Sequence, residues 1–137
     1  IPVAEKRAGG SVKHDVSVRL GELASFVERC RELIGRELPQ ARLSIYGHVG
    51  DGNVHFNVLA PTAIESQSFR DQHASEISHI VHDLAISRGG SFSAEHGVGQ
   101  LKRELLATSL DPVSMDLMRR LKANIDPKAL MNPGKLI

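Results

Sequence analysis

Two strand-like runs separated by a tight-turn dipeptide constrain the fold of this chain more than any other feature. The runs cover residues 42–49 (RLSIYGHV) and 53–59 (NVHFNVL), and Asp51-Gly52 lies between them. An Asp-Gly pair between two such runs is typical of a two-residue β-hairpin loop, because both residues tolerate the positive φ that the loop needs. The sequence therefore predicts an antiparallel hairpin, whose second strand ends at Pro61.

Amphipathic helices are predicted on both sides of this hairpin. Apolar residues recur every three or four positions over residues 20–38 and over about 64–88. A proline at position 39 stops the first helix, and a Gly-Gly pair ends the second. A further helix is expected to start with Asp111 as its N-cap and Pro112 in its first turn, and to run through Ile125.

Short extended segments complete the predicted sheet. Residues 12–18 alternate valine with polar residues, as a half-buried strand does. Residues 91–99 (SFSAEHGVG) predict a short extended piece that turns into a helix beginning near Gly97. The order strand, helix, strand, strand, helix, strand implies an α+β fold. We expect a ferredoxin-like antiparallel sheet covered by helices, plus a C-terminal helical segment.

Length and composition exclude several classes of protein. The 137 residues suffice for one domain or a large piece of one, and the start at Ile1 and Pro2 suggests a piece cut from a larger protein. With 17 basic and 16 acidic residues and no basic run, nucleic acid is not an expected partner. No apolar run predicts a transmembrane segment, and no secretory signal is evident. The single Cys30 fits a reducing compartment, so we expect a cytoplasmic protein, or a mitochondrial matrix protein if the source is eukaryotic.

The hairpin carries two histidines at a spacing that a metal site can use. If the Asp-Gly pair forms the loop, His48 lies directly opposite His55. Opposed residues hold their Cβ atoms roughly 4.5–5.5 Å apart, so the two imidazoles can share one metal ion. Strand alternation places Tyr46 and Asn57 on the same face as the histidines. The alternative is a solvent-facing hairpin that carries two histidines by chance.

A second cluster, Glu95-His96, lies at the predicted turn from strand to helix, beside Gly97 and Gly99. A carboxylate from this turn would complete a set of two histidines and one carboxylate, which leaves positions open for substrate or water. A helix starting there would also present free N–H groups to an anion. A simple helix N-terminus is equally compatible with the pattern.

Three segments resemble the C-terminal domain family of FAD-linked oxidases. They are GHVGDGNVHFNV (47–58), SAEHGVGQLK (93–102) and LKANIDPKALMNPGK (121–135), and the resemblance extends from VKHDVSV at 12–18 onward. Members of this family include D-lactate dehydrogenases, the glycolate oxidase flavin subunit and D-2-hydroxyglutarate dehydrogenase. The resemblance implies that residues 1–137 are a C-terminal cap or substrate domain. FAD would be bound mainly by an upstream FAD-binding domain that is absent from this sequence.

The resemblance also implies roles for single residues. In relatives that hold a metal, the ligands match His48, His55 and Glu95, and the catalytic base matches His96. A histidine suits this second task because it titrates near neutral pH. The set of two imidazoles and a carboxylate favours a divalent ion, zinc before others.

Four further positions match residues that bind substrate or cofactor in relatives. Lys13 and Asn57 match contacts to the carboxylate or hydroxyl groups of the substrate, although Lys13 is also compatible with a surface lysine. Asn132 and Lys135 belong to a tail that returns to the flavin domain in relatives, so they are expected to bind the cofactor. By spacing alone this NPGK tail is only a turn.

Together these features predict a flavin-dependent D-2-hydroxyacid dehydrogenase or oxidase, which converts a 2-hydroxyacid to the 2-oxoacid with hydride transfer to FAD. Its partners would be a small hydroxyacid, the upstream domain and an electron acceptor, and the sequence leaves a homodimer open. The 137 residues alone are expected to be colourless and inactive. Two rival functions are a free-standing metal-binding or ligand-sensing ferredoxin-like module without redox activity, and a structural dimerisation domain.

Overall fold

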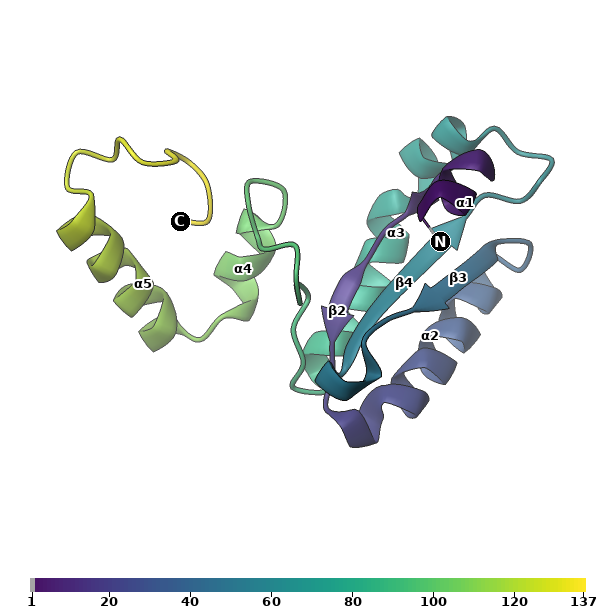
Figure 1. The fold of residues 1–137 in the computed structure, drawn as a ribbon, viewed down its shortest axis with the longest axis horizontal. Coiled ribbons are helices and arrows are strands. Elements are labelled where there is room, and N and C mark those ends of the chain that lie inside the picture. Colours follow the sequence, from purple (N-terminus) through teal and green to yellow (C-terminus); the bar gives the residue numbers. More distant parts are fainter. Residues whose placement is uncertain (1) are drawn as a thin grey trace. The chain divides into compact units, whose positions relative to one another are not determined.

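Strand β4 is the centre of a four-stranded antiparallel sheet. It pairs with β1 and β2 along one edge and with β3 along the other. Figure 1 shows β4 between β2 and β3. The computed structural model describes residues 2–137, and the strands are β1 (Ser11–Val12), β2 (Asp15–Ser17), β3 (Arg42–Tyr46) and β4 (Asn53–Leu59).

The strand predicted over residues 12–18 is interrupted at Lys13 and His14, which separate β1 from β2. The reason is a side chain that replaces a strand partner. The backbone N–H of His14 donates to Oδ1 of Asn57 at 3.3 Å instead of to a backbone carbonyl. The carbonyl of His14 still accepts from the N–H of Phe56 at 3.1 Å, so the segment stays beside β4.

Two long helices supply the apolar residues that bury one face of the sheet. Helix α2 (Leu23–Glu37) follows a short 3-10 turn η1 (Leu20–Glu22), and helix α3 (Ser66–Ser87) is the longest in the molecule as described. Figure 1 shows both helices running beside the strands. Their inward side chains pack on alternate residues of the strands, which confirms the α+β class. The core contains Val16, Val54, Phe56, Val58, Phe26, Cys30, Ile34, Ile77, Val81 and Ala85, among others.

Helix boundaries follow the capping residues of the sequence. Asp111 caps helix α5 (Pro112–Ile125) by accepting from the N–H groups of Val113 and Ser114 at 3.1 and 3.0 Å, as predicted. The carboxylate of Glu65 caps α3 in the same way. Gly89, with φ of 67°, follows α3 where the Gly-Gly pair predicted its end.

The hairpin loop is longer than the predicted two residues. Strand β3 ends at Tyr46, and a short 3-10 turn η2 (Val49–Asp51) follows before β4 begins. Tyr46 therefore lies opposite His55, and the predicted pairing of His48 with His55 is wrong. The physical reason lies in the carbonyl of His48, which accepts from the N–H groups of Asp51 at 3.0 Å and Asn53 at 3.2 Å. These bonds close a turn at the positions where the prediction required hydrogen bonds between two paired strands.

The last predicted strand is reduced to a single bridge between Ser17 and Ser91. Beyond it, the hydroxyl of Ser91 accepts from the N–H of Ser93 at 3.1 Å, and this local turn takes the chain out of the ladder. One more contact keeps the segment beside β2, because the N–H of Ala94 donates to the carbonyl of Asp15 at 3.1 Å.

The helix predicted near Gly97 is also wrong. Helix α4 (Arg103–Ser109) begins six residues later. Gly97 and Gly99 have φ of 72° and 57°, which a right-handed helix cannot contain. The proposed anion site at a helix start near Gly97 is lost with it.

The chain forms two compact units, one that ends at His96 and one from Gly97 to Ile137. The second unit contains α4, α5 and the tail, in which the N–H of Leu136 donates to the carbonyl of Gly99 at 3.1 Å. A short helix α1 (Pro2–Arg7) opens the first unit. Within residues 2–137, no helix has both the length and the apolar character needed to cross a bilayer.

Candidate metal and substrate site

The three predicted metal ligands lie together in the first unit. Nδ1 of His48 lies 2.7 Å from Oε1 of Glu95, and Nε2 of His55 lies 3.7 Å from Oε2 of the same carboxylate. The longer hairpin loop brings His48 into place, since η2 folds the chain back after β3. Glu95 arrives on the segment that follows the bridge to β2. The wrong strand register therefore does not prevent the three predicted ligands from lying close together.

These ligands differ in how firmly the protein holds them. The side chain of His55 is 12% exposed, because it projects from the central strand β4 between Tyr46 and the segment 93–96. The side chains of His48 and Glu95 are 61% and 43% exposed. A bound ion would therefore be anchored by His55 and remain open to solution on the side of His48.

The buried carboxylate of Asp15 is a site residue that the sequence reasoning missed. Its Oδ2 accepts from the backbone N–H groups of Glu95 at 2.7 Å and His96 at 2.8 Å. Its Oδ1 accepts from Nδ2 of Asn53 at 2.8 Å and lies 3.7 Å from Nδ1 of His55. A signal existed, because an aspartate within a run of valines needs a reason to be there.

Hydrogen bonds decide the charge state of Asp15. Burial of the carboxyl group by itself raises the pKa, since it disfavours the charged form. The two backbone N–H groups, the amide of Asn53 and the electrostatic interaction with His96 outweigh this effect and lower the pKa of Asp15 below its ordinary value. Asp15 is therefore a carboxylate at neutral pH.

His96, the predicted base, lies at the open edge of the cluster. Its side chain is 63% exposed, and its Nδ1 lies 3.6 Å from Oδ2 of Asp15. The rings of His96 and His55 are 5.8 Å apart between centroids. His96 is thus open to solution beside His55.

Asn57 occupies the predicted face of β4 but is fully enclosed. Its Nδ2 donates to Oε1 of Glu5 at 2.9 Å and lies 3.5 Å from the hydroxyl of Tyr46. Glu5 comes from α1 and is itself 4% exposed. Tyr46, His55 and Asn57 therefore share one face as predicted, but Asn57 contacts protein groups where the prediction placed a substrate.

Lys13 is exposed at the break between β1 and β2. Burial raises the pKa of the Glu5 carboxyl, but hydrogen bonds from Ser44 and Asn57, together with the charge of Lys13, lower it further than burial raises it. Lys13 and Asn57 thus both favour the charged form of the same Glu5 carboxyl group.

Donor atoms of the kinds that bind divalent ions lie close together, and the set of three within 4.8 Å contains Asp15 in place of the predicted His48. Donor atoms of Asp15, His55 and Glu95 all lie within 4.8 Å of one another. Ligands about 2.0–2.1 Å from a tetrahedral ion stand roughly 3.4 Å apart. The 3.7 Å between His55 and Glu95 is close to this spacing, whereas His48, at 2.7 Å from Glu95, would have to move away from it to bind the same ion. Two imidazoles and a carboxylate are also the donor types that zinc accepts.

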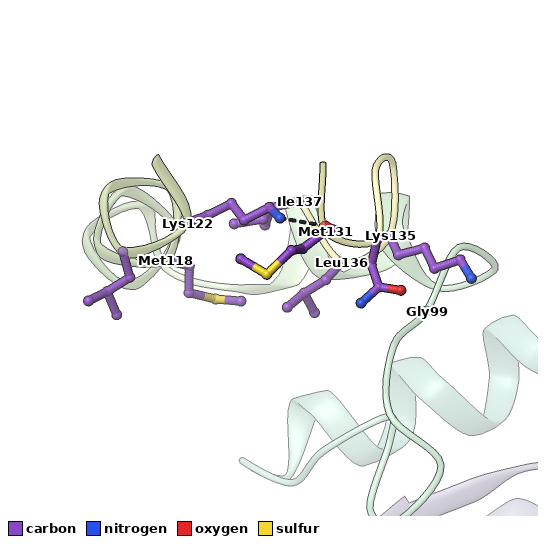
Figure 2. Close-up of a pocket in the computed structure, with 9 residues that line it drawn as sticks. Gly99, Met118, Lys122, Met131, Lys135, Leu136 and Ile137 are labelled. Carbon is purple, nitrogen blue, oxygen red and sulfur yellow. Dashed lines mark hydrogen bonds between the residues drawn. The ribbon is translucent and has the colours of Figure 1, made fainter. Parts of the chain in front are cut away.

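Asn132 and Lys135 lie in the second unit, on a pocket of about 560 Å³. Apolar side chains of Met118, Met131 and Leu136 form much of its lining (Figure 2). Nζ of Lys122 donates to the carbonyl of Met131 at 2.6 Å, which holds the tail against α5. Asn132 adopts a φ of 48°, a left-handed conformation that asparagine tolerates better than most residues.

Comparisons with known proteins identify the family of this chain. Residues 1–136 match the model of a family described as "FAD linked oxidases, C-terminal domain". The chain is 37% identical over 124 residues to D-2-hydroxyglutarate dehydrogenase of Stutzerimonas stutzeri (strain A1501), which covers 90% of this chain and 26% of the relative. It is also 37% identical over 138 residues to the mitochondrial D-2-hydroxyglutarate dehydrogenase of Bos taurus, covering 100% of this chain and 24% of the relative.

Another relative is named as a transhydrogenase. The D-2-hydroxyglutarate–pyruvate transhydrogenase of Saccharomyces cerevisiae is 33% identical over 144 residues, covering 100% of this chain and 28% of the relative. The chain thus spans about a quarter of the length of the curated relatives it matches. This chain belongs to the C-terminal domain family of FAD-linked oxidases.

Proposed function

We propose that this chain is the substrate- and metal-binding part of a flavin-dependent D-2-hydroxyacid dehydrogenase. The observation that carries the proposal is the meeting of His48, His55 and Glu95 beside His96. Such a cluster offers metal ligands and a base within one small volume. The similarity to D-2-hydroxyglutarate dehydrogenases makes D-2-hydroxyglutarate the first substrate to test.

His48, His55 and Glu95 would hold the metal. When bound, a divalent ion orients a 2-hydroxyacid and makes its hydroxyl group more acidic. The protein's part is geometric. His55 is anchored in β4, and the exposed His48 and Glu95 leave an open side for the substrate.

His96 would remove the proton of the substrate hydroxyl. Its ring is exposed and lies 5.8 Å from that of His55, so it can reach a substrate held at the cluster without being a ligand itself. A base in hydrogen-bond reach of the reacting group typically contributes about 10²- to 10⁴-fold in rate. Lys13 would supply a positive charge for a substrate carboxylate, provided that the substrate replaces Glu5 as the partner of this charge.

FAD would supply the acceptor for the hydride that leaves the carbon carrying the hydroxyl group. We propose that most of its binding site belongs to residues outside this chain, because the chain covers about a quarter of its relatives. The contribution of this chain would come from Asn132 and Lys135 at the tail. The electron acceptor that reoxidises the flavin would be a separate partner.

The test uses the full-length protein that contains this chain. Flavin absorbance is followed after addition of D- and L-2-hydroxyglutarate, D- and L-lactate, and glycolate, before and after treatment with a chelator. We expect reduction by a D-2-hydroxyacid, its loss on chelation and its return with zinc. If no hydroxyacid reduces the flavin, the proposal fails in favour of the metal-binding module without redox activity. If chelation leaves the rate of flavin reduction unchanged, the proposed role of the metal fails.

A further inference from the structure

The cluster depends on one buried residue that has no role in the function proposed above. Asp15 has a relative exposure of 1% and lies on β2, directly opposite His55 on β4. A buried charge is costly unless it is paired and hydrogen-bonded, and a buried ion pair is weak evidence for a role in stability. Its partners therefore indicate what the residue does.

All the partners of Asp15 belong to the site or its immediate support. The backbone N–H groups of Glu95 and His96 donate to Oδ2 at 2.7 and 2.8 Å. No helix holds this segment, because α4 begins only at Arg103. The two hydrogen bonds to Asp15 are thus a main reason why the carboxylate of Glu95 meets the two histidines.

The same carboxylate also lies near the Nδ1 atoms of His55 and His96. Nδ1 of His55 lies 3.7 Å from Oδ1 of Asp15, and Nδ1 of His96 lies 3.6 Å from Oδ2. A carboxylate near Nδ1 favours the tautomer that carries the proton there. The lone pair of Nε2 is then available on both rings, and on His55 this atom lies 3.7 Å from Oε2 of Glu95.

We infer that Asp15 is a positioning residue that orients His55 as a metal ligand and His96 as a base, while it holds the backbone of Glu95 and His96 in place. This inference rests on the proposed function. In this role Asp15 is not itself a metal ligand, because both its oxygens already accept hydrogen bonds from Asn53, Glu95 and His96. It acts through the histidines and through the segment that carries Glu95.

The substitution Asp15→Asn separates these two tasks. The carbonyl oxygen of an asparagine can still accept from the N–H groups of Glu95 and His96, but its NH₂ group would face His55 as a donor. The fold can accept this change at the Asn53 contact. Among the residues that the structure describes, Oδ1 of Asn53 is buried without a hydrogen-bond partner, so a rotated Asn53 amide offers an acceptor. Asp15→Ala removes both tasks.

The experiment uses the full-length enzyme in four forms: wild type, Asp15→Asn, Asp15→Ala and the control Asp83→Asn. Asp83 is an exposed residue of α3, so its variant makes the same change of charge away from the cluster. Zinc affinity is measured by competition with a chromophoric chelator. Hydrogen exchange reports on the amides of residues 93–96, and turnover is measured at saturating zinc.

We expect Asp15→Asn to bind zinc about 10- to 100-fold more weakly and to lose at least about tenfold in kcat at saturating zinc, with a smaller change in KM. Its amides at residues 93–96 should exchange as slowly as in the wild type. Asp15→Ala should show the same losses and faster exchange. Asp83→Asn should match the wild type in every measurement.

Two results would overturn the inference. One is an Asp15→Asn variant with unchanged zinc affinity and kcat; the other is faster exchange in Asp15→Asn equal to that in Asp15→Ala, which would reduce Asp15 to a structural support. A wild-type enzyme that holds no zinc would instead refute the metal site of the proposed function. In that case the exchange rates and kcat still decide the role of Asp15.

Discussion

Oε1 of Glu95 lies 2.7 Å from Nδ1 of His48, and this contact joins the loop after β3 to the segment after the bridge at Ser91. A proton between the two atoms would make a hydrogen bond, and a metal ion could instead be bound by both side chains. Because both side chains are partly exposed, the contact on its own contributes little to folding. Its value lies in the donor atoms that it brings together.

Replacing Glu95 by alanine is expected to remove the bound metal. The variant leaves His48 and His55 without the carboxylate that lies near both of them, and two imidazoles alone hold zinc weakly. Elemental analysis of the purified full-length enzyme measures the loss. Glu28→Ala, at an exposed position of α2, serves as the control and should keep the metal. Full zinc occupancy in the Glu95 variant would mean that Glu95 is not a ligand.

Replacing His96 by alanine is expected to keep the metal and slow the chemical step by about 10²- to 10⁴-fold. The reason is that a base must stay unligated in order to take a proton. Zinc content and single-turnover reduction of the flavin measure the two effects separately. His79→Ala, on the exposed side of α3, should change neither quantity. Loss of zinc from the His96 variant would contradict this division of labour between His96 and Glu95.

The buried contact of Glu5 with Asn57 is expected to make stability depend on pH. The pKa of Glu5 is lowered in the folded state, although burial by itself raises it, because hydrogen bonds from Ser44 and Asn57 and the charge of Lys13 favour the carboxylate. A carboxyl group with a lowered folded pKa stabilises the fold above its unfolded pKa of about 4.3. That contribution is lost as the pH falls through the lower folded value.

Urea unfolding of the wild type and of Glu5→Gln at pH 7 and at pH 3.5 tests this expectation. The wild type should be the more stable of the two at pH 7, and the difference should shrink at pH 3.5, because the protonated Glu5 resembles glutamine. Glu76→Gln, an exposed change on α3, provides the comparison. A difference that stays constant between the two pH values would show that the charge of Glu5 makes no contribution.

The thiol of Cys30 is expected to be unreactive in the folded protein. Burial in the core raises its pKa to about 12, so almost no thiolate is present at pH 8. A chromogenic disulfide reagent should therefore label the chain only after unfolding, and urea should restore the full reaction. Rapid labelling of the native protein at pH 8 would place Cys30 outside the closed core.

Local pattern was enough to predict much of the framework. Alternation in residues 53–59 sends Val54, Phe56 and Val58 into the core and leaves His55 and Asn57 on the other face, because successive side chains of a strand point to opposite sides. The Asp111 cap acts within one turn of its own helix. Such features depend on neighbours in sequence, so the sequence alone determines them.

Contacts between distant segments needed the tertiary structure. The position of His48 depends on a turn in which its carbonyl accepts two N–H groups, and the Asp-Gly pair by itself is compatible with that loop and with the shorter one. Asp15 reaches Glu95 only because the chain returns beside β2 after α3. The sequence could therefore identify His48, His55, Glu95 and His96 as chemically suitable residues. Long-range packing decided that Tyr46 faces His55, that Glu5 covers Asn57 and that Asp15 holds the cluster, because each contact joins segments that no local periodicity connects.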